Sequence, residues 1–244
     1  MTNTYTHQIR TDGFGAQYQC IIMTYLYCMK HNLTYKYSPF ITVAHNYDND
    51  PYYTNKLEVL MNLQSNIENN DSTSTVIHFY DMINDFEENI DEYCNSEGIQ
   101  FIKECFWKNK ERDHFNNNKI NIAIHIRREN VGDMGKAEDR ATTPNSYYLN
   151  IMNAIRATHR TEDKELLFHI YSQGTIEDFK EFETEDVEFH LDEYALTSFV
   201  GLVAADILVI SPSSFSYVAA FLNDGIIYAK PFWHRLKRDW ITDV

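Results

Sequence analysis

The sequence lacks a long apolar segment. No stretch of about 18 uncharged apolar residues, the length a membrane-spanning helix needs, occurs in its 244 residues. Residues 1–15 contain no apolar run of the kind found in signal peptides. We therefore expect no integral membrane segment and a cytoplasmic location.

Positive charge is also scarce. The chain has 21 lysines and arginines against 36 aspartates and glutamates, which gives a formal net charge of −15. This balance disfavours nucleic-acid backbones and anionic membrane surfaces as partners. An anionic ligand would need a local basic site, so the few clustered arginines are informative.

The cysteines and acidic residues give no metal-binding pattern. The four cysteines form no CxxC pair and lie in no histidine-rich segment, so they are expected to be reduced structural thiols. Asp48 and Asp50 have the D-x-D spacing of some metal sites, but they lie in a turn-rich stretch with no apolar strand before it. No metal site and no cofactor are predicted.

The composition indicates a globular chain of two domains. Hydrophobic residues make up 43% and aromatic residues 14%, which is enough for a packed core. A polar, turn-prone run at residues 115–118 separates an acidic middle region from an abruptly apolar segment. We therefore predict an N-terminal domain over residues 1–118 and a C-terminal domain over residues 119–244.

The N-terminal region begins with a strand, a loop and a helix. A short strand is predicted within residues 4–10, a glycine-containing turn at 12–15 and an apolar helix over 17–30. Backbone amides at the start of such a helix can approach an anion. Residues 46–118 are polar and acidic, and they predict only short helices.

The C-terminal region alternates between strands and helices. The pattern predicts strands at 119–126, 165–171, 187–190, 207–210 and 226–229, and helices at 143–157, 195–204 and 213–222. Short β-branched runs between helices are typical of buried parallel strands. The expected fold class is α/β, with a parallel sheet covered on both faces.

Polar residues follow several of these strands. Ligands collect at the carboxyl ends of strands in open sheets of this type. The residues expected at that rim are Arg127, Arg128, Ser172, Gln173, Leu191, Asp192 and residues 211–216.

Two neighbouring arginines end the first strand of this region. Arg127 and Arg128 follow an otherwise apolar run, where burying a guanidinium without a partner would be costly. The planar fork of arginine can bind two oxygens of a diphosphate at once. Two structural salt bridges to nearby acids would explain the pair equally well.

A hydroxyl-rich segment opens the helix at residues 213–222. Its hydroxyls and backbone amides would form an anion-binding helix end. The alternative is simple helix capping, which Ser213 or Ser214 could perform alone. The candidate contacts are Ser213, Ser214, Phe215 and Ser216.

Three motifs resemble those of the fucosyltransferase superfamily. Residues 125–128 look like H-x-R-R, and residues 211–220 look like S-x-S-S-F-S-x-x-A-A, as in the α-1,2-fucosyltransferases and their α-1,6 and protein-O relatives. Residues 13–19 are similar to the G-x-G-N-Q-x-x-Q loop of the α-1,2 enzymes. The three motifs have the order and spacing of the family and span most of the chain.

The resemblance implies a GT-B fold of two facing Rossmann-like domains. It implies an acceptor-side N-terminal domain, a C-terminal domain that binds the nucleotide sugar, inversion at the anomeric carbon and no required metal. The expected donor is GDP-fucose, and the expected acceptor is a carbohydrate. The expected catalytic residues are Arg127 and Arg128, and the expected nucleotide contacts are His125, Ser172, His190, Asp192, Ser213, Ser214, Phe215 and Ser216. The expected cleft loop contains Gly13, Phe14, Gly15 and Gln17.

The sequence also departs from the family pattern. Glu129 and Asn130 stand where the α-1,2 motif continues with Gly-Asp. Two alternatives therefore stay open, namely a transferase for another nucleotide sugar and a non-catalytic sugar- or nucleotide-binding module of the same fold. Candidates for a general base are Asp12, Glu129 and Asp133.

Overall fold

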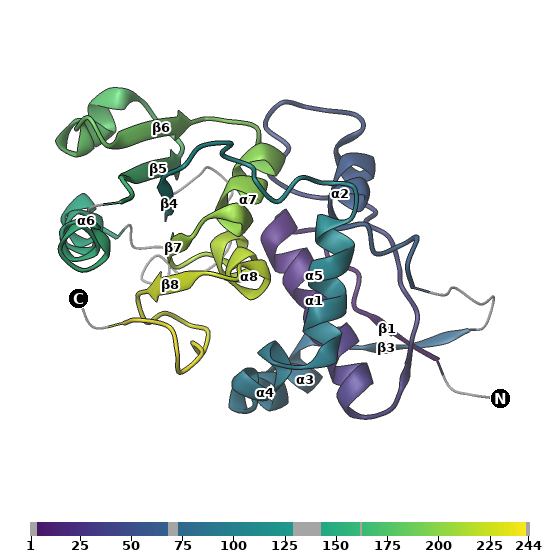
Figure 1. The fold of residues 1–244 in the computed structure, drawn as a ribbon. Helices are drawn as coiled ribbons and strands as arrows, with labels where there is room; N and C mark the ends of the chain where they lie inside the picture. Colours follow the sequence, from purple (N-terminus) through teal and green to yellow (C-terminus); the bar gives the residue numbers. More distant parts are fainter. Residues whose placement is uncertain (1–3, 68–72, 129–142, 162, 243–244) are drawn as a thin grey trace. The chain divides into compact units, whose positions relative to one another are not determined.

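A computed structural model describes residues 4–67, 73–128, 143–161 and 163–242 (Figure 1). The chain divides into two compact units, Met1–Glu111 and Arg112–Val244. The boundary predicted after residue 118 therefore falls inside the second unit. Within these described ranges each unit contains one sheet, and each unit is described by itself below.

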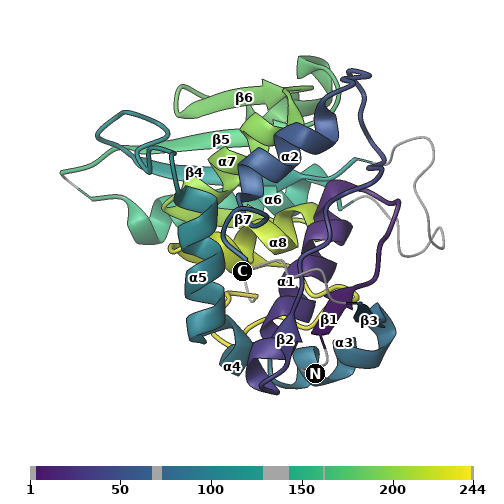
Figure 2. The ribbon, with the colours of Figure 1, turned by 90° about the vertical axis from the view of Figure 1, so that its right-hand side faces the viewer.

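The first unit is built on a small parallel sheet (Figure 2). Its strand order is β2-β1-β3, with β1 at Thr4–His7, β2 at Thr34–Tyr35 and β3 at Ser74–Ile77. The helices are α1 (Phe14–Lys30), α2 (Tyr53–Met61), α3 (Phe79–Glu88), α4 (Ile90–Cys94) and α5 (Glu97–Trp107). Helix α1 packs against the sheet and against α3 and α5.

Helix α1 is the central element of the first unit. Most of its 17 residues are buried, which explains why its sequence is apolar nearly all round. Lys30 in its last turn places a positive charge near the partial negative charge of the helix C-terminus. All four cysteines of the chain are free and buried, so the predicted reduced thiols agree with the structure.

The second unit contains a five-stranded sheet in which every neighbouring pair is parallel. The strand order is β6-β5-β4-β7-β8, with β4 at Ile120–Ile126, β5 at Leu166–Ser172, β6 at Val187–Leu191, β7 at Ile207–Ile210 and β8 at Ile226–Ala229. The connecting elements are α6 (Asn145–His159), the 3-10 helix η1 (Ile176–Phe182), α7 (Ala195–Ala204) and α8 (Ser214–Leu222).

The two faces of this sheet are covered by different helices. Side chains alternate between the faces along each strand. One face forms the core with α6 and η1, through residues such as Ile124, Phe168 and Met152. The other face meets α7 and α8 (Figure 1). The prediction of an α/β fold with parallel sheets is confirmed.

A tight connection joins α8 to β8. Asn223 is buried, and its side-chain amide donates to the carbonyl oxygens of Leu202, Val203 and Ala205 at the end of α7. Gly225 follows, and a Cβ atom there would lie 2.1 Å from the backbone oxygen of Asp206. Only a residue without a side chain lets the chain pass so close to the start of β7.

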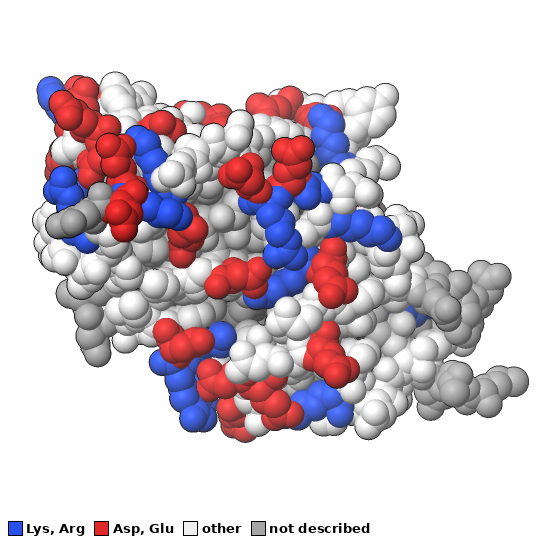
Figure 3. All heavy atoms as spheres, viewed as in Figure 1, with Lys and Arg blue, Asp and Glu red and all other residues white. Residues whose placement is uncertain are grey.

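No helix in the described ranges is long and apolar enough to cross a membrane. On the face seen in Figure 3, several lysines and arginines lie next to one another, with acidic side chains beside them.

Candidate functional site at the carboxyl ends of β4 and β7

The centre of the second sheet is a topological switch point. The chain runs outward from β4 through β5 to β6, and it then returns to the other side of β4 to form β7 and β8. Ligands of open α/β sheets bind outside the carboxyl ends of the strands where the order reverses. Here that position lies between the ends of β4 and β7, which hydrogen-bond to each other as parallel neighbours.

His125 connects the two strand ends. Its Nδ1 lies 2.9 Å from Oγ of Ser211, the residue that follows β7. The His125 ring also lies against Phe215 in the first turn of α8, with 5.5 Å between ring centroids. The structure therefore brings the motif at residues 125–128 into direct contact with the motif at residues 211–220.

The environment of His125 favours its neutral form. Burial, and secondarily the positive charge of Arg127, lower the pKa of His125 to about 3. A group with so low a pKa is a weak base near neutral pH. His125 is therefore suited to hydrogen bonding and positioning rather than to proton abstraction.

The serines at the start of α8 have different surroundings. Ser213 is the N-cap, and its Oγ accepts a hydrogen bond of 3.3 Å from the backbone N–H of Phe215. Oγ of Ser216 is buried and bonds to the backbone N–H and C=O of Ser211, both at 3.3 Å. These two hydroxyls hold the loop in shape, whereas Ser214 and Phe215 are partly exposed.

The two arginines leave β4 in different directions. Nη1 of Arg127 donates to the carbonyl oxygen of Arg128, and the charge of Arg127 contributes to the lowered pKa of His125. Arg128 lies over the ring of Phe179, 4.9 Å from its centroid, and donates through Nη2 to Oδ1 of Asn145. Among the described residues, Nη1 of Arg128 is buried without a hydrogen-bond partner.

Tyr148 is a candidate site residue that the sequence did not reveal. Its hydroxyl is buried, and it makes no hydrogen bond of good geometry with a described residue, although Thr143 and Ser211 are close enough to lower its pKa. Burial is the larger effect and raises that pKa. Burial lowers the pKa of Arg128 and Tyr148 partly offsets this; Nη1 of Arg128 is the other buried polar atom here that has no hydrogen-bond partner of good geometry among the described residues. Unpaired buried donors of this kind are costly unless a ligand satisfies them.

The remaining predicted rim residues lie at the ends of β5 and β6. Ile126, Ser172 and Leu191 are in register across the three strands. Oγ of Ser172 donates to the carbonyl oxygen of Ile126 at 2.8 Å, which fastens β5 to the end of β4. Asp192 is exposed, has a left-handed backbone with φ of 51°, and accepts a 3.4 Å hydrogen bond from Gly174.

His190 points away from this rim. Its ring stacks on Tyr171, with 4.4 Å between centroids, and its Nε2 lies 3.1 Å from Nδ1 of His169. The side chain is therefore on the face of the sheet that carries His169 and Glu188.

The predicted cleft loop lies in the first unit. Gly13 is the N-cap of α1, and a Cβ there would lie 2.9 Å from the ring of His45. Phe14 and Gly15 are buried. Nε2 of Gln17 donates to the carbonyl oxygens of Asp12 and Thr42, at 2.7 and 2.9 Å. Gln17 thus holds the loop in place.

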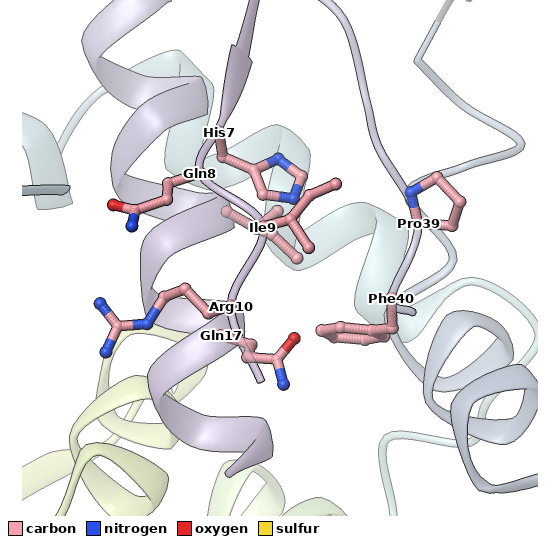
Figure 4. Close-up of a pocket in the computed structure, with 8 residues that line it drawn as sticks. His7, Gln8, Ile9, Arg10, Gln17, Pro39 and Phe40 are labelled. Carbon is pink, nitrogen blue, oxygen red and sulfur yellow. The ribbon is translucent and has the colours of Figure 1, made fainter. Parts of the chain in front are cut away.

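A small hollow adjoins this loop (Figure 4). Its volume is about 10 Å³, which is room for roughly one water molecule. Arg10 lies at the edge of this hollow. The Nε of Arg10 donates to both carboxylate oxygens of Asp12, and this pairing raises the pKa of the guanidinium. The other candidate bases, Glu129 and Asp133, lie outside the described residues.

Solved structures of fucosyltransferases resemble this chain. Fucosyltransferase NodZ from Bradyrhizobium is 12% identical over 91% of this chain and 94% of its own, with a TM-score of 0.45. FUT1 of Arabidopsis thaliana in complex with GDP is 10% identical over 98% of this chain and 72% of its own, with a TM-score of 0.47. POFUT1 in complex with GDP is 12% identical over 92% and 95%, with a TM-score of 0.46.

No protein-family model matches the sequence, and no curated protein matches it. The function is therefore inferred from the residues of this chain.

The lowered pKa of His125 predicts how the free energy of unfolding depends on pH. Above pH 6.5 the histidine is neutral in both the folded and unfolded chain, whereas between pH 6.5 and about 3 only the unfolded chain binds the proton. The free energy of unfolding should thus fall on acidification by up to about 1.4 kcal/mol per pH unit from this residue. His7, with a pKa lowered by burial to about 4, adds a similar dependence in the first unit.

Urea unfolding of the wild type and of a His125→Gln variant at pH 7 and pH 5 measures this contribution. We expect a smaller loss of stability on acidification in the variant. His78→Gln, at an exposed position, is the control and should behave like the wild type. An equal pH dependence in both variants would contradict the prediction.

Proposed function

We propose that the second unit binds the diphosphate of a nucleotide sugar at the ends of β4 and β7, and that the chain transfers the sugar to a hydroxyl of a glycan. One observation carries the proposal. The His125–Ser211 hydrogen bond joins the two strand ends at the switch point, beside Arg127 and the first turn of α8.

Positive charge and helix-end amides supply the anion site. The first backbone amides of α8 lie at the positive end of the helix dipole, and that of Phe215 donates to the N-cap hydroxyl of Ser213. Arg127 adds a full charge near His125, and the unpartnered Nη1 of Arg128 is a further donor. A diphosphate would pair with these groups, and the hydroxyl of Tyr148 could donate to the same ligand.

Transfer follows from stabilising the leaving group. The acceptor oxygen attacks the anomeric carbon while the bond from that carbon to the diphosphate oxygen breaks, so negative charge grows on the diphosphate. Fixed donors beside that charge lower the barrier. Attack from the side opposite the leaving group inverts the anomeric carbon, and we propose that arginine and amide donors neutralise the diphosphate without a metal.

The proposed donor is GDP-fucose. The three motifs that resemble the fucosyltransferase superfamily support this choice. Asp192 is exposed beside the end of β6, where its carboxylate could accept the amino and imino protons of guanine. Ser214 and Phe215 are the partly exposed residues of α8 nearest in sequence to its N-cap, and they complete the proposed donor contacts.

The non-catalytic module remains a second candidate because Glu129 and Asn130 replace the Gly-Asp of the family motif. Incubation with GDP-fucose in the absence of an acceptor distinguishes a transferase from a non-catalytic binding module. A transferase releases free fucose by slow hydrolysis, whereas a binding module produces none.

We expect GDP to bind more tightly than UDP or ADP, because only guanine offers paired donors to Asp192. Isothermal titration calorimetry with the three nucleotides measures the difference. Asp192→Asn should reduce the preference for GDP, and Asp163→Asn, at another exposed aspartate, should leave it unchanged. Equal affinities of the wild type for GDP and UDP would remove guanine from the proposal and favour another nucleotide sugar.

A further inference from the structure

A second cluster of polar side chains lies away from the proposed diphosphate site. His169 of β5 and Glu188 and His190 of β6 share the face of the sheet on which α7 packs. Nδ1 of His169 lies 3.1 Å from Nε2 of His190 and 3.5 Å from a carboxylate oxygen of Glu188. One ligand atom from each residue lies within 4.8 Å of the others.

The hydrogen bonds around Asn121 fix the tautomer of His169. Nδ2 of Asn121 donates to the carbonyl oxygen of Lys119, so the amide nitrogen cannot be the atom that faces the imidazole. Oδ1 of Asn121 lies 3.1 Å from Nε2 of His169 and accepts its proton. The other ring nitrogen, Nδ1, therefore presents a lone pair to Glu188 and His190.

The ring of His190 is oriented so that its Nε2 faces Nδ1 of His169. Its Nδ1 faces a carboxylate oxygen of Glu193 at 3.5 Å, and its ring stacks on Tyr171. If Nδ1 carries the proton toward Glu193, Nε2 presents a second lone pair to His169. Two lone pairs 3.1 Å apart repel each other unless a cation lies between them.

The geometry favours a metal ion as that cation. With bonds of 2.0–2.1 Å, the donor atoms of a tetrahedral zinc site lie roughly 3.4 Å apart. Two of the three separations within the cluster, 3.1 and 3.5 Å, are close to that value, and the third is at most 4.8 Å. Histidine ligands of metals also donate their other N–H to a carboxylate or carbonyl group, as His190 faces Glu193 and His169 faces Asn121.

The local charge also favours a dication. Glu188 and Glu193 lie beside the two imidazoles, and among the described residues neither carboxylate forms an ion pair with a lysine or arginine. Their negative charge is therefore available to a cation. Two imidazoles and a carboxylate form a common ligand set for zinc.

We propose that His169, Glu188 and His190 bind a Zn²⁺ ion. The Glu188 side chain is 57% exposed and that of His190 is 24% exposed, so a fourth coordination position can be filled by water. The ion would join the edge strand β6 to β5 and would stabilise the second unit. Its ligands are separate from Arg127 and the start of α8, so sugar transfer would not depend on it.

Zinc binding can be measured directly on the full chain. The protein is stripped with a chelator and titrated with Zn²⁺ alone by calorimetry, and Co²⁺ is added separately to record its visible absorption. We expect one equivalent of Zn²⁺, a higher melting temperature with the metal, and cobalt bands of the intensity typical of four-coordination.

Variants test the assignment of ligands. His190→Gln and Glu188→Gln should each weaken Zn²⁺ binding by more than about 10-fold, since even residues behind the ligands contribute 10- to 100-fold. His159→Gln and Glu177→Gln are matched controls outside the cluster and should bind as the wild type does. Glu188 is exposed enough that its replacement should leave the fold intact.

Three results would overturn the proposal. They are the absence of Zn²⁺ binding by the folded wild type, wild-type affinity in both ligand variants, and equal losses in the controls. Absence of Zn²⁺ binding would mean that a proton shared by His169 and His190 occupies the space between the two rings. If the proposal holds, EDTA should lower the melting temperature, while any transferase activity measured well below that temperature should persist.

Discussion

Replacing Arg127 by lysine should reduce sugar transfer by roughly 100- to 1,000-fold, the usual effect of losing one charged or polar donor to a developing negative charge. Lysine preserves the charge but supplies a point charge on a mobile stem, whereas the proposed role needs a planar fork that spans two diphosphate oxygens. Initial rates with GDP-fucose over a range of donor concentrations would separate an effect on kcat from an effect on KM.

Two further arginines make this experiment specific. Arg156 pairs through two nitrogens with Asp186 and stacks on Phe168, so Arg156→Lys should change stability more than turnover. Arg128→Lys tests the second donor. If Arg128→Lys abolishes transfer while Arg127→Lys keeps it, the roles of the two arginines are exchanged, and full activity in both variants would exclude the diphosphate site.

Gly225→Ala should lower the free energy of unfolding of the second unit by about 3 kcal/mol. The new Cβ would meet the backbone oxygen of Asp206 at 2.1 Å, and this neighbour belongs to the backbone, so it cannot rotate away. Forcing atoms into a packed site typically costs about 1 to 3 kcal/mol. Urea unfolding of the wild type and variant gives the difference.

Asp224→Ala is the matched control one residue earlier. Its carboxylate pairs with Arg112 at 3.4 Å, and both side chains are about 60% exposed. Such surface pairs contribute about 0 to 1 kcal/mol, so the control should lose little stability. A Gly225→Ala variant as stable as Asp224→Ala would show that β8 can move away from β7 at low cost.

The second unit was more predictable from sequence than the first. Strands such as β4 and β7 are short β-branched runs buried on both faces, and that composition distinguishes them from helices. By contrast, β2 has two residues, and β3 is largely exposed, so neither has a pattern long enough to detect. Their positions depend on pairing with β1, which is a tertiary contact.

The site residues also divide into those that a local sequence pattern predicts and those that depend on tertiary contacts. Arg127 and Ser211 could be placed at one rim because each follows a predicted strand of a parallel sheet. Tyr148 could not, since a buried aromatic residue in a helix has the same sequence pattern whether it completes the core or faces a ligand. The cluster of His169, Glu188 and His190 depends on the register between β5 and β6, which no local motif encodes.

Side chains alternate between the two faces of the sheet along β4. The number of residues in this strand therefore determines which side chain reaches Ser211. His125 reaches Ser211 from one face, while its neighbours Ile124 and Ile126 belong to the core on the other. Insertion or deletion of a single residue within β4 would send the imidazole into the hydrocarbon core and an isoleucine toward Ser211. A variant that keeps every polar residue of the motifs but gains one residue inside β4 would therefore lose the contact between His125 and Ser211.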